Sequence, residues 1–408
     1  RSLKNVNVKL TIIDKTNHHL FQPLLYQVAT SALAPRDIAY PIREILKKQK
    51  NVIVIMDEAT EVLTSEKTVL FKSDRRLEYD YLIVAVGSKQ SYFGNKDWEK
   101  FAPGLKTLND AVKINHQLLK AYEMAEATDS RSQADRLLTF VVIGGGPTGV
   151  ELAGTMAEIA QKTMTRNFRL IDPSRTRVLL IEAAPRILTA YPESLSKKAE
   201  EDLKSLGVTV LTSTKVTDID EFGVQIGSKK IFTNNIVWAA GNDCPAMLKT
   251  LGVPQDRESR VIVNPDLSIP GHPEVFIIGD SAHIKDQNGN LIPGIAPAAI
   301  QQGKYVGQLI KKGVPPHNRK PFRYHDKGLM ATIGKARAIA IIGKFEFSGF
   351  LAWCLWSFVH VAFLVGFRTR SFVMLEWMFW YITERRSSRL IYESDRRDVD
   401  SNLNHSRQ

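Results

Sequence analysis

Residues 137–160 have the sequence LLTFVVIGGGPTGVELAGTMAEIA, and this stretch decides the fold. The β-branched run 138–143 leads directly into the pattern Gly144-x-Gly146-x-x-Gly149, and an apolar helical pattern follows it. In such a loop the first glycine permits a tight turn, the second lets the backbone approach a pyrophosphate, and the third allows close contact between helix and strand. The phosphates then lie at the positive N-terminus of the helix. The stretch therefore predicts a Rossmann-type nucleotide site.

The next buried strand, residues 178–182 (VLLIE), ends in an acid. A carboxylate at this place accepts hydrogen bonds from a ribose 2′-hydroxyl and repels a 2′-phosphate. Arg186 lies only four residues further on, and an arginine near this place accommodates a 2′-phosphate in some nucleotide sites. We predict that Glu182 binds the ribose and that the site prefers NADH to NADPH; an exposed acid at a strand end is the alternative.

The same pattern occurs a second time in the chain. The strand 8–14 (VKLTIID) ends in Asp14, which stands where a second adenosine ribose would bind. The glycine loop that belongs with this copy does not appear, so we expect either a truncated chain or weakened binding of the second nucleotide. Further apolar runs in the two copies end in residues that we expect at the cofactors: Gly87, Gly241, Gly279 and Asp280. On spacing alone, Asp280 fits a helix N-cap equally well.

The run 275–280 (VFIIGD) belongs to the first copy but follows the second, so the second domain is inserted within the first. The predicted fold class is α/β, with two Rossmann-like nucleotide-binding domains and a C-terminal membrane-associated helical segment. We place the first domain at residues 1–106 and 243–312 and the second at 107–242. A membrane-anchoring region is expected at 320–390 and a polar tail at 391–408.

The charge distribution indicates an anionic partner. The chain has 408 residues and a formal net charge of +12, and residues 301–345 hold ten Lys or Arg but one acid, Asp326. Because this basic stretch leads into the most apolar part of the chain, it favours an anionic membrane surface over nucleic acid. A solvated basic face without a partner is the alternative.

The two cysteines, Cys244 and Cys354, lie far apart and form no CxxC pattern. They predict neither a disulfide framework nor a metal site, and they leave disulfide reductases and thiol-dependent sulfide oxidation without the redox pair that these enzymes need.

Residues 349–367 (GFLAWCLWSFVHVAFLVGF) carry no formal charge apart from His360. Nineteen apolar residues just suffice to cross a bilayer, so a single transmembrane helix is one interpretation. His360 in the middle, the glycines and the nearby tryptophans favour helices that lie in one leaflet. A buried core helix is the third interpretation.

Together the segments GGGPTGVELAG, LLIEAAPRIL, VFIIGDSAH, APAAIQQGKY and NHHLFQPLLYQVATSAL resemble the type II NADH:quinone oxidoreductases. The resemblance covers nearly the whole chain, because DKGLMATIG and WSFVHVAFLVGFRTR resemble the membrane-anchoring part of that family. It implies NADH oxidation without proton pumping, hydride transfer to non-covalent FAD, and reduction of a membrane quinone in a respiratory chain.

The resemblance also implies roles for individual residues. Asp14 would bind the adenosine ribose of FAD, Asp280 would lie near its ribitol chain, and Glu151 would lie near the nicotinamide. The quinone site of the family has the pattern Ala-Gln-x-x-x-Gln, which implies roles for Gln301 and Gln302, although proline replaces the first glutamine at 297.

We expect a membrane-associated protein that faces the cytoplasm, and a homodimer stays open. The alternative function is a membrane-attached, flavoprotein-like binding or signalling module with little redox activity, which flavin bleaching by NADH would exclude.

Overall fold

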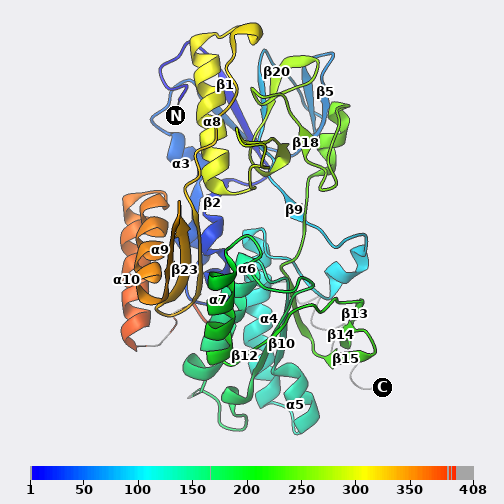
Figure 1. Cartoon of the computed structure of the whole chain (residues 1–408), viewed down its shortest axis with the longest axis vertical. Coiled ribbons are helices and arrows are strands. Elements are labelled where there is room, and N and C mark those ends of the chain that lie inside the picture. The colour runs from blue at the N-terminus through cyan, green and yellow to red at the C-terminus, as the bar shows by residue number, and fades with distance from the viewer. Residues whose placement is uncertain (1, 166, 384–385, 387, 392–408) are drawn as a thin grey trace.

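The computed structural model describes residues 2–165, 167–383, 386 and 388–391. The chain forms an elongated molecule in which one α/β unit lies at each end (Figure 1). The upper unit in that view contains β1, β20 and α8, and the lower unit contains β10, β12 and α4 to α7. A third layer, with β23, α9 and α10, lies on the flank of the molecule where the two units meet.

The lower unit has a parallel sheet in the order β12-β11-β10-β16. The inner strand β10 is buried at all five positions, because β11 and β16 pair with its two edges and helices cover its faces. The strands are β10 (Thr139–Ile143), β11 (Arg177–Ile181), β12 (Val208–Leu211) and β16 (Asn235–Trp238). The helices are α4 (Leu108–Glu126), α5 (Arg131–Leu137), α6 (Pro147–Glu158) and α7 (Glu193–Ser205).

The upper unit has its parallel strands in two separate sheets. One is the pair β1 (Leu10–Asp14) and β4 (Val52–Met56), and the other has the order β19-β20-β8. The sequence predicted a buried parallel strand at 8–14, but the five residues of β1 are only half-buried. Among the described residues β1 pairs with β4 alone, so one edge stays open, whereas β10 has a partner on each side.

The insertion predicted from the sequence is visible in the strand pairing. Strand β8 (Leu82–Val84) comes before the lower unit and β20 (His272–Ile277) comes after it, yet the two pair in parallel. The two connecting segments also pair, because β9 (Lys89–Gln90) runs antiparallel to β17 (Asn242–Asp243). Thr107, where we placed the start of the inserted domain, caps α4: its hydroxyl accepts from Asp110 N at 3.2 Å.

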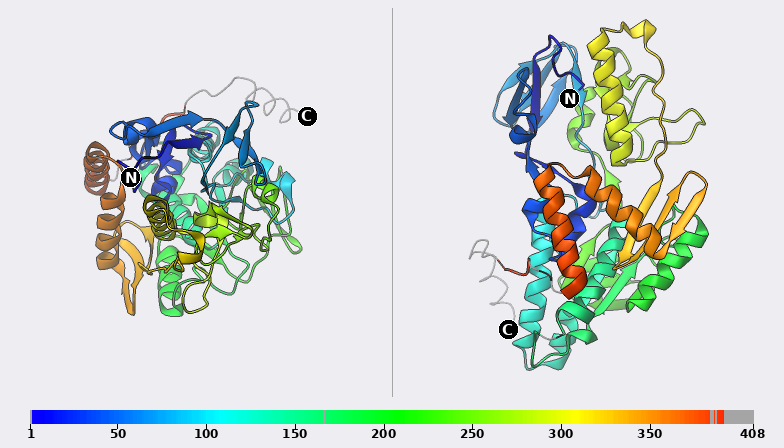
Figure 2. Two further views of the ribbon diagram at one scale, coloured as in Figure 1. Left: turned by 90° about the horizontal axis from the view of Figure 1, so that it is seen from above. Right: turned by 90° about the vertical axis from the view of Figure 1, so that its left-hand side faces the viewer.

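The C-terminal layer starts with an antiparallel sheet that sequence reasoning did not anticipate. It consists of β22 (Leu329–Gly334), β23 (Arg337–Ile342) and β24 (Phe345–Ser348). Helices α9 (Gly349–Phe363) and α10 (Phe367–Thr383) lie outside it, side by side (Figure 2). On the inner side β22 packs on α6, where a Cβ at Gly154 would lie 1.8 Å from Ile333 O. Only glycine allows this helix and strand to lie so close.

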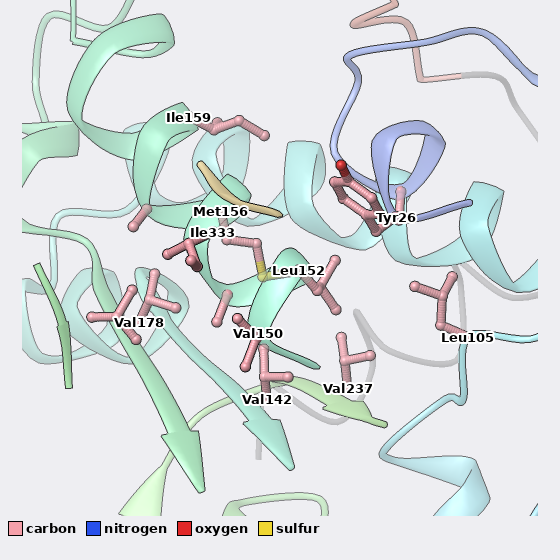
Figure 3. Close-up of a cluster of buried hydrophobic side chains, with 14 of the residues drawn as sticks. Tyr26, Leu105, Val142, Val150, Leu152, Met156, Ile159, Val178, Val237 and Ile333 are labelled. Atoms are coloured by element: carbon pink, nitrogen blue, oxygen red, sulfur yellow. The ribbon is translucent and has the colours of Figure 1, made fainter. Parts of the chain in front are cut away.

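One apolar core joins the lower unit to α1 and to the C-terminal layer, whereas β8, β20 and α8 of the upper unit contribute to separate clusters. Its members come from β10, β11 and β16, from α6, from the short helix α1 (Leu25–Ala29) and from β22. Figure 3 shows Tyr26 of α1, Leu152 and Met156 of α6 and Ile333 of β22 around this core. Since burial of such side chains drives folding, the lower unit and the C-terminal layer form a common packing unit.

The remaining described elements are the long helix α8 of the upper unit and short connections and edges. The strands are β2 (His18–Leu20), β3 (Ala39–Pro41), β5 (Ala59–Leu63), β6 (Thr68–Phe71), β7 (Arg76–Glu78), β13 (Asp218–Asp220), β14 (Gly223–Ile226), β15 (Lys229–Phe232), β18 (Val261–Ile262), β19 (Ser268–Ile269) and β21 (Ala282–His283). The helices are α2 (Pro35–Ile38), α3 (Ile42–Leu46), α8 (Ala296–Lys312), the π-turn η3 (Ile159–Thr163) and the 3-10 turns η1 (Gln22–Leu24), η2 (Lys96–Lys100), η4 (Pro173–Arg175), η5 (Ala246–Leu251), η6 (Gly279–Ser281) and η7 (Pro316–Asn318).

Candidate functional site

The loop 144–149 connects β10 to α6, as the sequence predicted. Gly144 has φ +115°, and a Cβ there would lie 2.7 Å from the backbone of Ala239. A Cβ on Gly149 would lie 1.9 Å from Gly144 O, so the helix and the loop touch at this point. At Gly146, the N-cap of α6, a Cβ would meet nothing within 4 Å. The open side of the loop therefore faces the helix N-terminus, the place where a pyrophosphate binds.

Glu182 lies directly after β11 and holds this loop. Its Oε2 accepts a hydrogen bond from Gly145 N at 2.5 Å, and its Oε1 accepts from Ala184 N at 2.7 Å. These bonds fix the carboxylate beside the glycine loop. Glu182 is half-buried and both of its carboxylate oxygens are bonded, so it is not the exposed acid of the alternative interpretation.

Arg186, the nearby arginine, is engaged elsewhere. Its guanidinium donates to Leu188 O at 3.2 Å, to Tyr191 O at 2.9 Å and to Thr189 O at 3.0 Å. Three backbone carbonyls thus hold the cation to its own loop.

Asp14 ends β1, and its Oδ1 accepts from Thr16 N and Thr16 Oγ1, both at 2.8 Å. Lys15, Met56 and Asp57 line an open pocket of about 390 Å³ at the carboxyl ends of β1 and β4. Ligands of α/β sheets bind at such strand ends. A carboxylate beside an open pocket fits the adenosine half of a dinucleotide.

A second group of polar residues gathers at the ends of β8 and β20. Asp280 Oδ2 accepts from Ser88 Oγ at 3.0 Å, and Lys106 Nζ donates to the same hydroxyl at 3.2 Å. Burial lowers the pKa of Lys106. The short turn η6 has Ile278 as its N-cap, so Asp280 does not cap it. Sequence reasoning missed Ser88, which lies shortly after β8, and Lys106, which lies just before α4, because neither belongs to a recognisable pattern.

The glycines at the other strand ends adopt backbone conformations that suit glycine. Gly87, Gly241 and Gly279 have φ values of +66°, +70° and +74°. Gly87 O accepts from Ser281 Oγ at 2.8 Å, which joins the ends of the two paired strands.

Gln301 and Gln302 lie in the first half of α8 and make structural bonds. Gln302 is 2% exposed, and its Oε1 accepts from Gly279 N at 2.6 Å. Gln301 bonds the backbone of His325 twice, donating to its carbonyl at 2.9 Å and accepting from its N–H at 3.0 Å. The two amides thus connect α8 to the end of β20 and to the segment before β22.

Glu151 lies on α6 where α1 and β22 meet that helix, and it is 9% exposed. Burial raises the pKa of its carboxyl to about 8. Thr332 N donates to it at 3.4 Å, which lowers the pKa only in part. At neutral pH the carboxyl is therefore mostly protonated.

Helices α9 and α10 are apolar on two faces. Val373 and Trp377 of α10 are buried at 0% and 7% exposure, while Leu375 and Phe379 are 55% and 48% exposed. A helix that is hydrophobic on all sides is normally buried. Further exposed apolar side chains lie on the same pair of helices: Phe350, Leu351, Phe358, Phe363, Phe372, Met374, Met378 and Ile382. We call these residues, with Leu375 and Phe379, the apolar face.

The family profile of pyridine nucleotide-disulphide oxidoreductases matches residues 1–303, and the NDH2 C-terminal domain matches residues 326–386. The chain is 41% identical over 401 residues to the type II NADH:quinone oxidoreductase Ndh of Mycobacterium tuberculosis, covering 95% of this chain and 86% of that one. The chain belongs to the type II NADH:quinone oxidoreductase family. Its relative NdhA from the same organism is also 41% identical, covering 96% and 87% of the two chains.

The solved structure of NDH2 from Plasmodium falciparum in complex with NADH has the same fold as this family member. It superimposes with a TM-score of 0.86 at 21% identity and covers 96% of this chain and 97% of that chain. Sulfide:quinone oxidoreductase from Aquifex aeolicus shares the fold more distantly, with a TM-score of 0.70 at 19% identity and coverage of 89% and 86%.

Family membership confirms the main predictions from the sequence. The type II oxidoreductase is a FAD-dependent enzyme with an α/β fold that oxidises NADH without pumping protons and reduces a quinone. The roles of individual residues and the domain boundaries stay predictions.

Residues 349–367, which the sequence allowed as one transmembrane helix, do not form a single continuous helix. Helix α9 ends at Phe363, Leu364 leaves the helical conformation with ψ 141°, and Gly366 follows with φ +86°. Within the described part of the chain, no helix combines the length and the apolar character that a membrane crossing needs. The predicted polar tail at 391–408 lies, apart from Ile391, outside the described residues.

Proposed function

We propose that this chain binds NADH at the loop 144–149 and FAD at the strand ends of the upper unit, and reduces a quinone that arrives from an anionic membrane surface. The observation that carries the proposal is the open loop at the N-terminus of α6 in a chain of this family. The N–H groups of Gly144 and Gly145 bond to Ile181 O and to Glu182, so a pyrophosphate would be bound by the N–H groups of the first turn of α6, where the helix dipole favours its charge.

The choice of NADH over NADPH rests on Glu182 and Arg186. The fixed carboxylate accepts hydrogen bonds from a ribose diol, whereas a 2′-phosphate would meet its negative charge. The guanidinium that would otherwise compensate that phosphate is bound to three carbonyls of its own loop. Both residues therefore disfavour the phosphorylated cofactor.

For FAD, the residues present fit the two ends of the dinucleotide, while the glycine loop that would hold its pyrophosphate is not among the described residues. Asp14 would bind the adenosine ribose, and Asp280, with Gly279 and Gly87 beside it, would bind the sugar-alcohol chain. FAD supplies the chemistry that accepts a hydride and passes on two electrons. The protein orients the groups around it: Ser88 and Lys106 fix the Asp280 carboxylate, and Gln302 fixes Gly279.

Glu151 would lie near the nicotinamide and hold a proton there. Its burial keeps the carboxyl mostly uncharged at neutral pH, which avoids repulsion of electron-rich groups nearby. Gln301 and Gln302 would act near the quinone by holding the turn at Gly279 and the segment at His325. Their bonds support a positioning role.

The membrane part of the proposal rests on the apolar face and the basic residues near it. An apolar face with cations near it, such as Lys344 and Arg370, suits the interface of an anionic membrane. The protein would lie on the cytoplasmic side of that membrane. A lipid-dissolved quinone would then approach from the membrane while NADH approaches from water. A homodimer, left open by the sequence, is tested by the molar mass in detergent.

The test is anaerobic addition of NADH to membrane-bound protein while the visible absorbance of the flavin is recorded, followed by addition of a quinone. Bleaching and then recovery are expected. If bound flavin keeps its absorbance with NADH, the chain is a binding module and the proposal fails.

A further inference from the structure

A small, partly enclosed cavity lies where α1, α6 and the C-terminal layer meet. Its volume is about 10 Å³, room for the centre of one water molecule. The lining is polar as well as aromatic and includes Tyr26, Thr155, Glu158 and Trp356. Figure 3 shows Tyr26 facing the last turns of α6 in this region.

Two groups that line the cavity have unused hydrogen-bonding capacity. Glu158 is 4% exposed, and its Oε2 has no hydrogen-bond partner among the described residues, although its Oε1 accepts from Lys335 N. Trp356 is 2% exposed, and its indole Nε1 also lacks a partner in the described part of the chain. A buried acceptor and a buried donor on one cavity are costly unless something joins them.

Arg386 lies beside this acceptor and is 2% exposed. Its Nη2 is 3.6 Å from Glu158 Oε2, too far for a hydrogen bond, and its guanidinium lies over the Trp380 ring at 4.7 Å. Its Nη1 donates to Thr30 O at 2.6 Å, at the end of α1. Arg386 therefore connects the chain after α10 with α6 through the ion pair and with the end of α1 through the hydrogen bond.

A second buried bond joins the same elements. Trp377 Nε1 of α10 donates to Gln27 Oε1 of α1 at 2.8 Å, and Gln27 donates in turn to the Tyr26 hydroxyl at 2.9 Å. Helices α10 and α1 are thus held together by polar contacts that lie inside the core. A group that completes these contacts has a structural effect on both.

We propose that one water molecule occupies the cavity, accepts a hydrogen bond from Trp356 Nε1 and donates one to Glu158 Oε2. It completes a clamp, made of Glu158, Arg386, Trp356 and Thr30, that fixes α10 and the apolar face against α1 and α6. Water is the ligand that fits, because the space admits one small molecule. One of the two groups, the indole N–H, donates and the other, the carboxylate oxygen, accepts, and a water molecule can serve both.

The direct test is an experimental structure of the full chain at a resolution that shows ordered waters. Density within hydrogen-bond distance of both Trp356 Nε1 and Glu158 Oε2 is expected. An empty cavity, or a direct bond between the two side chains, would overturn the proposal.

A double-mutant cycle tests the bridge in solution. Trp356→Phe and Glu158→Gln should each lower the melting temperature. The smaller ring of phenylalanine costs the same in the parent and in the Glu158→Gln variant, so this cost cancels in the cycle. Because the water couples the two side chains, the double variant should differ from additivity by about 2 °C or more. Additive shifts would contradict the bridge.

The matched control is Ser357→Ala, since Ser357 Oγ is also buried without a partner but does not line the cavity. Combined with Glu158→Gln, it should give additive shifts. Equal coupling in both cycles would mean that the Glu158 variant disturbs the whole layer, and the clamp water would be rejected.

Discussion

The carboxylate of Glu182 accepts a hydrogen bond from the backbone N–H of Gly145 at 2.5 Å, so the group predicted to bind the ribose also holds the loop predicted to bind the pyrophosphate. This bond joins two parts of the nucleotide site that are 37 residues apart in sequence. Substitutions at this strand end should therefore affect nucleotide selectivity and loop order together.

Glu182→Gln should lower kcat/KM for NADH by roughly 10- to 100-fold, because hydrogen bonds to a charged group contribute about 1.5–3 kcal/mol. The ratio of NADPH to NADH activity should rise, since the charge that repels a 2′-phosphate is gone. Steady-state kinetics with both nucleotides measure this. An unchanged ratio would mean that Glu182 does not determine selectivity.

Gly146→Ala should weaken NADH binding and leave stability nearly unchanged, whereas Gly149→Ala should lower stability. A methyl group at 146 meets no protein atom, so the free energy of unfolding should stay within about 0.5 kcal/mol, while NADH binding weakens roughly tenfold as the methyl group occupies the phosphate approach. At 149 the methyl group meets Gly144 O, and unfolding should become easier by about 1–3 kcal/mol or more. Denaturant titration and nucleotide titration separate the two effects. Equal NADH affinity in Gly146→Ala and the parent would place the phosphate elsewhere.

His360 should make stability depend on pH. Burial lowers its pKa from 6.5 to about 4, although its bond to Trp356 O opposes the shift. Between these values the unfolded chain binds a proton that the folded chain does not, so stability is full above pH 6.5 and falls with decreasing pH by about 1.4 kcal/mol per unit. Urea titrations at several pH values measure the slope. His360→Phe should reduce it between pH 4 and 6.5; an identical slope would assign it to other groups.

The apolar face should bind lipid without contributing to folding. Leu375→Asp with Phe379→Asp should reduce flotation with anionic vesicles at least roughly tenfold, because charged groups are costly at the interface, and should change unfolding by no more than about 1 kcal/mol. Val373→Asp, on the buried side of the same helix, should instead unfold the layer. If the double variant floats like the parent, the membrane contact lies on another surface.

The local features of the nucleotide sites were predictable from the sequence. The loop 144–149 and Glu182 lie where their types and spacing indicated, because a tight turn between a buried strand and a helix has few solutions. The end of the first apolar helix was placed too late, at 367 instead of 363, since a hydropathy pattern does not report the conformation of Leu364 and Gly366. The layer β22 to β24 was missed because the burial of its strands comes from α6 and α9, which the pattern along a single strand does not report.

The bonds of Gln301 and Gln302 lay outside any local rule. Their partners, His325 and Gly279, are 24 and 23 residues away, and only the tertiary fold brings these groups together. The same is true of Arg386, whose contact with Thr30 spans 356 residues. Sequence patterns describe neighbours on one element, whereas these contacts join separate parts of the chain.

The contact between Gly154 and Ile333 gives a criterion for comparing relatives. Any side chain at 154 would push β22 away from α6 and, with it, the helices outside the sheet. A substitution there could be inherited only together with a shifted or missing third layer. The residue type at this one position should therefore divide homologous sequences into those that keep this layered arrangement and those that have lost it.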